Sequence, residues 1–348
     1  MFDIRKMEIK RKISVYIALC FIVTLVGCKK EADVKKEYSQ GVFAMDTYMT
    51  LTAYGEKGEE GVNEAIEEIQ RLEQLWAVTS TTGEVSQINK NGSGEISQDT
   101  IEIVEKAQEI MEDTQGAFDI TIYPLMELWG FTTGNYQVPK EEERNERLAL
   151  VCGENIVLNK EDKTLTLEMG QKIDFGGIAK GYTSGKIMDM WREKGITSGI
   201  VSLGGNVQVL GTKPDGTLWK IGVKKPGDTE GNLLGILSVS DCAVITSGGY
   251  ERYFEEDGVS YHHILDTDTG APADSGLISV TIVSRDGALA DGLSTALFTM
   301  GKEDAITYWK EHKQEFEAVL VEESGEIWIT EGLEDKFSTE ESYQIIEE

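Results

Sequence analysis

Apolar residues recur every three or four positions in several segments of the chain, which is the spacing of an amphipathic α-helix. The clearest example is residues 62–76, where Val, Ala, Ile, Leu and Trp fall on one predicted face. Residues 101–112 repeat the pattern, and Asp99 and Glu102 are placed like an N-terminal capping pair. Further helices are predicted over residues 180–194, 288–300 and 304–312.

Short runs rich in β-branched residues predict strands between these helices. They cover residues 200–203, 207–210, 220–223, 244–246 and 277–284, and residues 318–321 with 327–330 predict a closing hairpin. Strands and helices follow one another without regular alternation, which favours an α+β fold with mainly antiparallel sheets and packed helices. No linker or repeat interrupts residues 41–337, so we expect one domain there, followed by an acidic tail over residues 338–348.

The N-terminus has the pattern of an export signal. Basic residues precede a mostly apolar run from residue 13 to 26, which is too short to cross a hydrocarbon layer of roughly 30 Å comfortably. The run ends in Leu25-Val26-Gly27-Cys28, which resembles a bacterial lipoprotein box. We therefore predict a lipoprotein signal peptide over residues 1–27, a lipid on Cys28 and a charged tether over residues 28–40. The protein would then be anchored on the extracytoplasmic side of the cell membrane; a plain secretory signal is the alternative.

The net charge excludes one class of partner, and the cysteine content excludes a cysteine-based metal site. With 33 Lys and Arg against 62 Asp and Glu, the net charge of −29 excludes a nucleic-acid partner, because phosphate backbones require clustered basic residues. Cys20 leaves with the signal peptide and Cys28 is consumed by lipid. Cys152 and Cys242 make no metal motif, so we expect small buried hydrophobic residues, with one disulfide as the alternative.

Candidate chemistry lies in three stretches. In the segment DFGGIAKGY, Asp174 and two glycines precede Lys180 at a predicted helix start, where backbone amides and the ammonium can face an anion; a plain surface turn is the alternative. Asp291 and Thr295 are four residues apart and share a helix face, a donor pair that suits Mg²⁺. Asp291 could instead cap its helix. His263, on a predicted strand, could be structural or catalytic.

Together these blocks occur in the order found in one family. They are FAMDTYMT, GAFDITIYPLMELWGF, DFGGIAKGY, SLGGNVQVLGTKPDGTLWKIGV, VITSGGYERYF, HHILDTDTGAP and SVTIVSRDGALADGLSTALFTMG. Over residues 41–300 the sequence resembles the ApbE-type FAD:protein FMN transferases, also called flavin transferases. The resemblance implies an ApbE-like, T-fold-like α+β architecture that binds FAD with one or two Mg²⁺ ions. It also implies transfer of FMN to a Ser or Thr of an exported or membrane flavoprotein subunit, with release of AMP.

The resemblance also implies roles for individual residues. Asp291, Thr295 and a backbone oxygen placed at Gly177 match metal ligands, and His263, with Asp291, matches the catalytic group. The positions that match family FAD contacts are Met45, Ala117, Phe118, Asp119, Asp174, Lys180 and Leu265.

Two departures from the family pattern are visible. Residues 77–83 read AVTSTTG, so an aromatic lid expected near position 79 is missing, which puts flavin or adenine stacking there in doubt. Residues 266–268 read Asp-Thr-Asp instead of Asp-Pro-x, a change we expect to affect only a turn. Two alternative functions remain: an FAD pyrophosphatase, in which water is the nucleophile, and a non-enzymatic, membrane-tethered FAD-binding lipoprotein.

Overall fold

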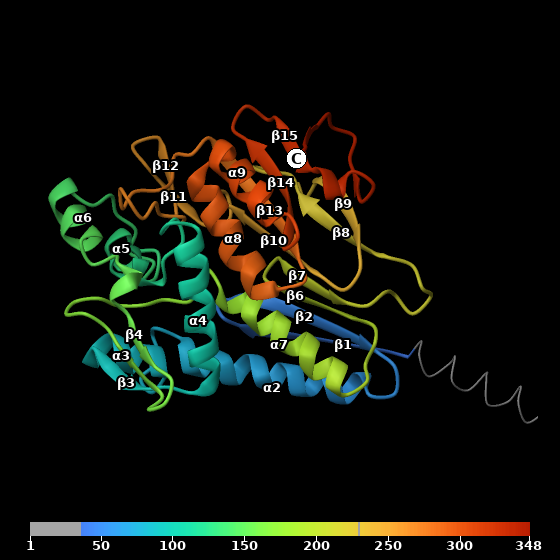
Figure 1. Cartoon of the computed structure of the whole chain (residues 1–348), viewed down its shortest axis with the longest axis horizontal. Coiled ribbons are helices and arrows are strands. Elements are labelled where there is room, and N and C mark those ends of the chain that lie inside the picture. The colour runs from blue at the N-terminus through green and yellow to red at the C-terminus, as the bar shows by residue number, and fades with distance from the viewer. Residues whose placement is uncertain (1–35, 229) are drawn as a thin grey trace, which may run out of the picture.

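The computed structural model describes residues 36–228 and 230–348, and its centre is a nine-stranded sheet (Figure 1). Neighbouring strands pair antiparallel throughout, except for the last two, which are parallel. This arrangement confirms the predicted α+β class with mainly antiparallel pairing. In spatial order the strands are β1 (Glu37–Ala44), β2 (Thr47–Tyr54), β6 (Gly199–Leu203), β7 (Asn206–Leu210), β10 (Ala243–Gly248), β13 (Leu277–Ser284), β14 (Phe316–Glu322), β15 (Ile327–Thr330) and β17 (Gln344–Ile346).

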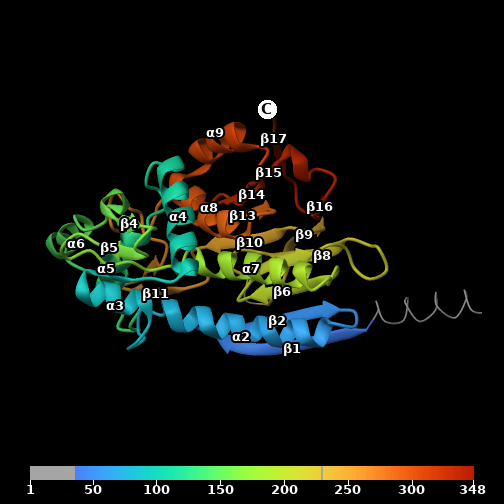
Figure 2. The ribbon, with the colours of Figure 1, turned by 60° about the horizontal axis from the view of Figure 1, so that its bottom comes forward.

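Helices cover one face of this sheet (Figure 2). α2 (Gly58–Trp76) packs on β1 and β2, α7 (Ala179–Glu193) on β6 and β7, and α8 (Gly287–Met300) on β10 and β13. α4 (Gln98–Asp113) and α9 (Lys302–His312) pack against α8. All five helices lie where apolar periodicity predicts them, because that periodicity supplies the face that each helix buries.

The opposite face is covered by a small sheet of β8 (Trp219–Lys224), β9 (Leu233–Val239) and β16 (Phe337–Ser338). Ile221 and Leu237 of this sheet share one apolar cluster with Val244 and Val319 of the large sheet. Two packed sheets therefore enclose a second core behind the helical layer.

The remaining elements lie mostly at one end of the large sheet (Figure 1). They are α3 (Glu84–Asn91), β3 (Ser93–Glu95), α5 (Tyr123–Trp129), α6 (Glu141–Leu148), β4 (Val157–Asn159), β5 (Thr164–Thr166), β11 (Tyr253–Glu256), β12 (Val259–His262) and the short 3₁₀ turns at Ile120–Ile122, Gly153–Asn155 and Glu331–Leu333. This end carries the β11–β12 hairpin, next to which His263 lies.

The structure corrects four details of the sequence analysis. The segment taken as an acidic tail is not free, because β17 joins the large sheet and Ile346 is buried beneath its acidic neighbours. β1 begins at Glu37, so the end of the predicted tether belongs to the sheet. The cap of α4 is Ser97, whose hydroxyl accepts from the Thr100 amide, and Asp99 lies inside the helix. Cys152 and Cys242 are free thiols, and only Cys242 is fully buried.

The predicted signal peptide and Cys28 lie outside the described residues. Within residues 36–228 and 230–348, none of the helices combines the length and apolar character needed to cross a membrane.

Candidate active site

Asp291 lies where two helices touch through glycines. A Cβ on Gly181 of α7 would lie 2.1 Å from the Gly287 carbonyl oxygen of α8, and one on Gly287 would lie 2.5 Å from the Gly181 carbonyl oxygen. Backbone contact of this kind is open only to glycine. It brings the second turn of α8, with Asp291, against the first turn of α7.

The Asp291 carboxylate is buried and hydrogen-bonded on both oxygens. Oδ2 accepts from the Gly181 amide and Oδ1 from the Asn206 side chain, each at 2.8 Å. Burial raises the pKa of Asp291, and Lys180 and these hydrogen bonds oppose the rise. Asp286, not Asp291, caps α8 by accepting from the Leu289 amide at 3.0 Å. The alternative reading of Asp291 as the cap of its own helix is therefore wrong.

The three predicted metal-ligand positions lie together. A Cβ on Gly177 would be 3.8 Å from the Thr295 hydroxyl oxygen, and Ser247 Oγ lies 3.3 Å from the same hydroxyl. Thr295 is one helical turn after Asp291 on α8. Within the described part of the chain, no cluster of three or more His, Cys, Asp or Glu side chains could hold a metal. A cation here would therefore use one carboxylate with hydroxyl and backbone oxygens, a hard donor set that fits Mg²⁺.

Lys180 stands in the first turn of α7, at the centre of the charged groups. Its ammonium lies 3.4 Å from the Gly176 carbonyl oxygen, and its charge acts on Asp174 and Asp291. The Asp174 carboxylate accepts a short hydrogen bond from the Gly176 amide, and burial raises the pKa of Asp174. The segment from Asp174 to Lys180 is thus a tight turn whose charged groups face the same region as Asp291.

His263 follows β12 and is fixed by one carbonyl group. Its backbone amide and its ring Nδ1 both lie 3.1 Å from the Arg252 carbonyl oxygen. A carbonyl oxygen can only accept, so Nδ1 carries the proton and the lone pair of Nε2 is free. Burial, with the positive charge of Arg252, lowers the pKa of His263 to about 3. The ring of Phe131, 6.3 Å away, flanks the imidazole.

Met45 and Asp46 form the two-residue turn between β1 and β2, with φ of 47° and 58°. Both are left-handed without being glycine, a strained conformation that surrounding contacts must hold. The Met45 amide donates to Glu73 of α2 at 2.6 Å. The charge of Asp46 also acts on Asp174, which places this turn beside the Asp174 segment.

The other predicted FAD contacts are divided. The ring of Phe118 lies against Gly177, where a Cβ would be 3.0 Å from it, and Ala117 is half-buried on the same core. Asp119 has a structural use: its carboxylate accepts from the Thr121 amide and hydroxyl, both at 2.7 Å, and from the Gly153 amide at 2.8 Å. Leu265 is buried in the apolar cluster of α5. A binding role for these residues stays a prediction.

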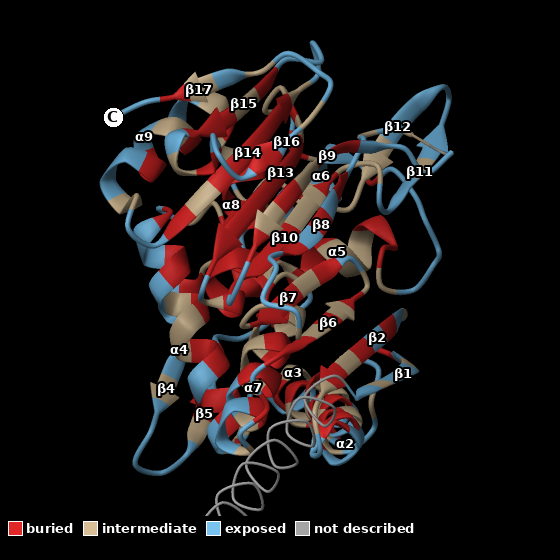
Figure 3. Cartoon of the chain, turned by 90° about the vertical axis from the view of Figure 1, so that its right-hand side faces the viewer, coloured by how far each residue is buried: buried red, intermediate tan, exposed pale blue. Residues whose placement is uncertain are grey.

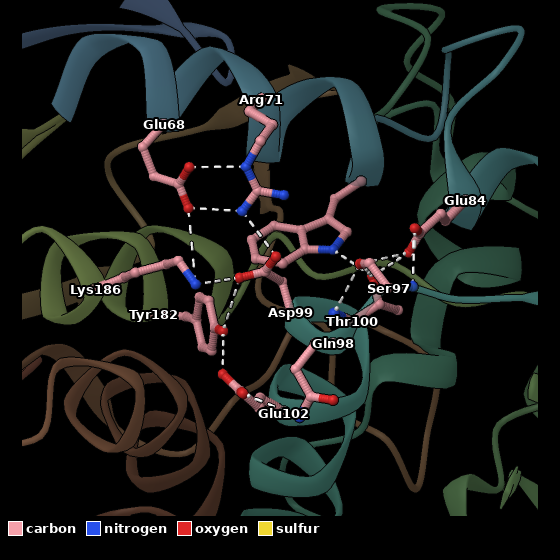
Figure 4. A network of polar contacts seen from close by, with 11 residues as sticks. Glu68, Arg71, Glu84, Ser97, Gln98, Asp99, Thr100, Glu102, Tyr182 and Lys186 are labelled. Atoms are coloured by element: carbon pink, nitrogen blue, oxygen red, sulfur yellow. Dashed lines mark hydrogen bonds and ion pairs between the residues drawn. The ribbon is translucent and has the colours of Figure 1, made fainter. Parts of the chain in front are cut away.

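Behind the site, a polar network joins α2, α4 and α7 (Figure 4). Asp99, only 8% exposed, accepts from Arg71 of α2 at 2.7 Å and pairs with Lys186 of α7. Although burial works in the opposite direction, Lys186 and Arg71 lower the pKa of Asp99. The hydroxyl of Tyr182 donates to Glu102 at 2.7 Å. This network fixes the orientation of α7, and with it the position of Lys180.

An aromatic contact carries this support to the loop before α7. The indole of Trp76 donates to Thr100 at 2.9 Å and packs edge-on against the rings of Tyr182 and Phe175. Phe175 directly follows Asp174 in the chain. The loop from Asp174 to Lys180 therefore packs on the buried side chain of Trp76 through Phe175.

Four residues with no predicted role lie at the site or directly behind it. Asn206 and Glu73 hold Asp291 and Met45, as described above. Arg252 holds the His263 ring, and Tyr182 links α7 to α4. Asn206 follows the paired glycines 204 and 205, and Tyr182 follows the loop glycines, but nothing in their spacing indicates which atoms they would meet.

Comparison with known proteins identifies relatives of this chain. A family model described as the ApbE family matches residues 45–320. The FAD:protein FMN transferase of Vibrio cholerae is 36% identical over 63% of this chain and 67% of its own. That of Klebsiella pneumoniae is 33% identical over 72% of this chain and 78% of its own.

Solved structures show the same fold. The ApbE protein of Thermotoga maritima superposes with a TM-score of 0.81 at 34% identity, covering 86% of this chain and 99% of its own. The apo form of the flavinyl transferase ApbE of Pseudomonas stutzeri gives a TM-score of 0.77 at 27% identity, covering 87% of this chain and 97% of its own. Because the ApbE family model matches residues 45–320, which is most of the chain, this protein belongs to the ApbE family.

Proposed function

We propose that this protein is an FAD:protein FMN transferase, which moves the FMN part of FAD to a Ser or Thr hydroxyl of a flavoprotein and releases AMP. The observation that carries the proposal is that the charge of Lys180 on α7 acts on both Asp291 of α8 and His263 after β12, which places groups from three separate elements in one region. In the reaction, the acceptor oxygen forms a bond to the phosphorus of the FMN part. The bond from that phosphorus to the bridging oxygen breaks, and the oxygen leaves with AMP.

Mg²⁺ belongs to this proposal as a bound ion. Asp291, Thr295 and the Gly177 backbone oxygen would hold it, since Gly177 lies against Thr295, Thr295 is one helical turn after Asp291, and all three offer oxygen donors. When bound, the ion offsets negative charge on the pyrophosphate. Burial raises the pKa of Asp291 because it disfavours the charged form of the carboxylate, and a cation beside the carboxylate would stabilise that form.

Lys180 supplies fixed positive charge to the same region. It stands at the N-terminal turn of α7, where the helix dipole also favours anions. In a chain with a net charge of −29, a local cation of this kind is needed to attract a dinucleotide. The network of Asp99, Lys186 and Tyr182 holds α7 so that Lys180 keeps this position.

His263 is suited to take the proton of the acceptor hydroxyl. Its Nδ1 is committed to the Arg252 carbonyl, so Nε2 is the atom that can accept a proton. With a pKa of about 3, the ring stays neutral at physiological pH and is always in the accepting form. The low pKa makes it a weak base, so it assists a nucleophile that attacks an already polarised phosphorus.

The test is mass analysis of an acceptor. The full chain would be incubated with FAD, Mg²⁺ and a respiratory flavoprotein subunit that lacks flavin. Transfer predicts that the acceptor gains the mass of FMN. A pyrophosphatase would instead release AMP and free FMN without an acceptor, and a binding protein would release no AMP.

For location, we propose a lipid anchor on Cys28 and a position on the extracytoplasmic side of the membrane. The first residue of β1, Glu37, is nine positions after Cys28, a length of chain that could span up to about 30 Å between the anchor and the catalytic domain. Replacing Cys28 with Ser is expected to release the protein from membranes with its activity intact. Continued membrane association of that variant would exclude the anchor.

A further inference from the structure

Two aromatic side chains are exposed on the hairpin of β1 and β2. Phe43 and Tyr48 are 71% and 65% exposed, and they face each other directly in the strand register. Figure 3 shows β1 at the edge of the sheet with much of its length exposed. Paired exposed aromatic residues are unusual on a surface that has no partner, because each ring could bury a large apolar area.

Phe43 and Tyr48 lie on a hairpin that packs against the core. A Cβ on Gly41 would lie only 2.0 Å from the Tyr48 hydroxyl oxygen, so the Tyr48 side chain extends across β1 in space that only glycine leaves open. On the other face of the hairpin, Met49 and Leu51 are completely buried in the core formed with α2 and α7. The outward rings therefore stand on a hairpin that is packed from behind, and not on a loose loop.

The pair also borders the candidate active site. Phe43 and Tyr48 are each two residues from the Met45–Asp46 turn, which Glu73 holds and whose Asp46 acts on Asp174. Directly after the adjacent strand, Gly204 lies two residues before Asn206, and a Cβ on Gly204 would lie 2.5 Å from the Thr47 hydroxyl oxygen. The outward face of the hairpin is thus continuous with the turns that frame the site.

The position of the N-terminal segment favours a protein partner over a membrane. Residues 1–35 lead into β1 at Glu37, and Phe43 is six residues further along an extended strand, about 20 Å away. A tether that starts at Cys28 would therefore join the hairpin at the end opposite to the aromatic pair. A transferase, in contrast, must receive a second protein beside its site, since the hydroxyl that it modifies is part of that protein.

We infer that Phe43 and Tyr48 form the docking surface for the acceptor flavoprotein, against an apolar or aromatic side chain near its Ser or Thr. The inference rests on the proposed function. An aromatic anchor of this kind commonly contributes enough to binding that its truncation weakens affinity tenfold or more. The surface would act on the acceptor alone, because the residues predicted to contact FAD and Mg²⁺ do not include Phe43 or Tyr48.

The experiment compares the full-length wild type with the double variant Phe43→Ser/Tyr48→Ser in the flavinylation assay. The KM for the acceptor protein is expected to rise at least about tenfold, with kcat and the Kd for FAD unchanged. Tyr48→Phe keeps the ring and is expected to behave like wild type. Val157→Ser, at a residue 62% exposed on β4, is the matched control for loss of a surface apolar side chain.

An unchanged KM for the acceptor in the double variant would overturn the inference while leaving the transferase intact. So would a change in the Kd for FAD of the same size, since the rings would then belong to the FAD site. Loss of binding to anionic lipid vesicles, or of self-association in sedimentation, with an unchanged KM would assign the surface to a membrane or to a second copy. If the wild type transferred no FMN, the proposed function itself would fail.

Discussion

The backbone amide of Gly181 donates a hydrogen bond to Oδ2 of Asp291 over 2.8 Å, and so joins the first turn of α7 to the second turn of α8. Gly181 lies next to Lys180, so this one contact sets the distance between the cation and the buried carboxylate. The site is therefore a property of how two helices pack, and its parts cannot be moved independently.

Gly181→Ala is expected to force the helices apart, because its Cβ would fall 2.1 Å from the Gly287 carbonyl oxygen. Overpacking of this kind costs about 1–3 kcal/mol of folding free energy, and we expect a loss of FAD turnover with it. The control is Gly185→Ala on the same helix, where a Cβ would meet nothing within 4 Å. Denaturant unfolding should show Gly185→Ala as neutral or slightly stabilising; equal destabilisation of both variants would contradict the packing argument.

Asp291→Asn is expected to abolish Mg²⁺-dependent AMP release and to leave the fold in place, because the amide keeps the size of the side chain but not its charge. AMP is measured at several Mg²⁺ concentrations. Asp286→Ala on the same helix removes the cap of α8 and should cost about 1 kcal/mol of stability without affecting turnover at saturating Mg²⁺. Near-normal turnover of Asp291→Asn at low Mg²⁺ would show that Asp291 is only structural.

His263→Ala is expected to slow FMN transfer by about 10²-fold, the lower end of the usual contribution of a general base, because its low pKa makes it a weak base. The Kd for FAD should change little. His262→Ala is the matched control, since His262 Nε2 lies 3.1 Å from the Ala273 carbonyl oxygen and its ring packs edge-on against Phe298. That variant should lose stability but not rate. A rate loss of equal size in both variants would make His263 a structural residue.

The low pKa of His263 also predicts a dependence of stability on pH. The folded protein holds the ring neutral down to a pKa of about 3, whereas the unfolded chain binds a proton near pH 6.5. The stabilisation is thus complete above pH 6.5 and is lost as the pH falls from 6.5 towards 3. His263→Gln, which cannot titrate, should lose less stability than wild type between pH 7 and 4 in urea unfolding. Parallel pH curves for the two proteins would show that the fold does not hold His263 neutral.

The elements predicted from sequence are those with strong periodicity. α2, α4, α7, α8 and α9 each bury an apolar stripe, and β13 is rich in β-branched residues. β1 was not predicted, because an edge strand with one exposed face carries little hydrophobic pattern: its burial alternates only from Val42 onwards. β17 was not predicted because acidic residues surround its short apolar run, although Ile346 is buried in the core.

Some residues of the site were also predicted from local spacing, whereas others were not. Spacing on one helix placed Asp291 and Thr295 together, and the glycines before Lys180 predicted the turn at the start of α7. The partners that come from distant segments, Asn206 for Asp291 and Arg252 for His263, could not be predicted. Such contacts depend on how β6–β7 and β11–β12 are placed around the helices, and no local pattern in the sequence records that placement.

The central claim is that this site joins FMN to a protein hydroxyl, and the ratio of products tests it most directly. AMP and flavinylated acceptor would be measured in one reaction of the full chain with FAD and Mg²⁺, with the acceptor present and then omitted. The account predicts one modified acceptor for each AMP released, and almost no AMP when the acceptor is omitted. AMP release at the same rate in both reactions, with no gain in acceptor mass, would contradict it.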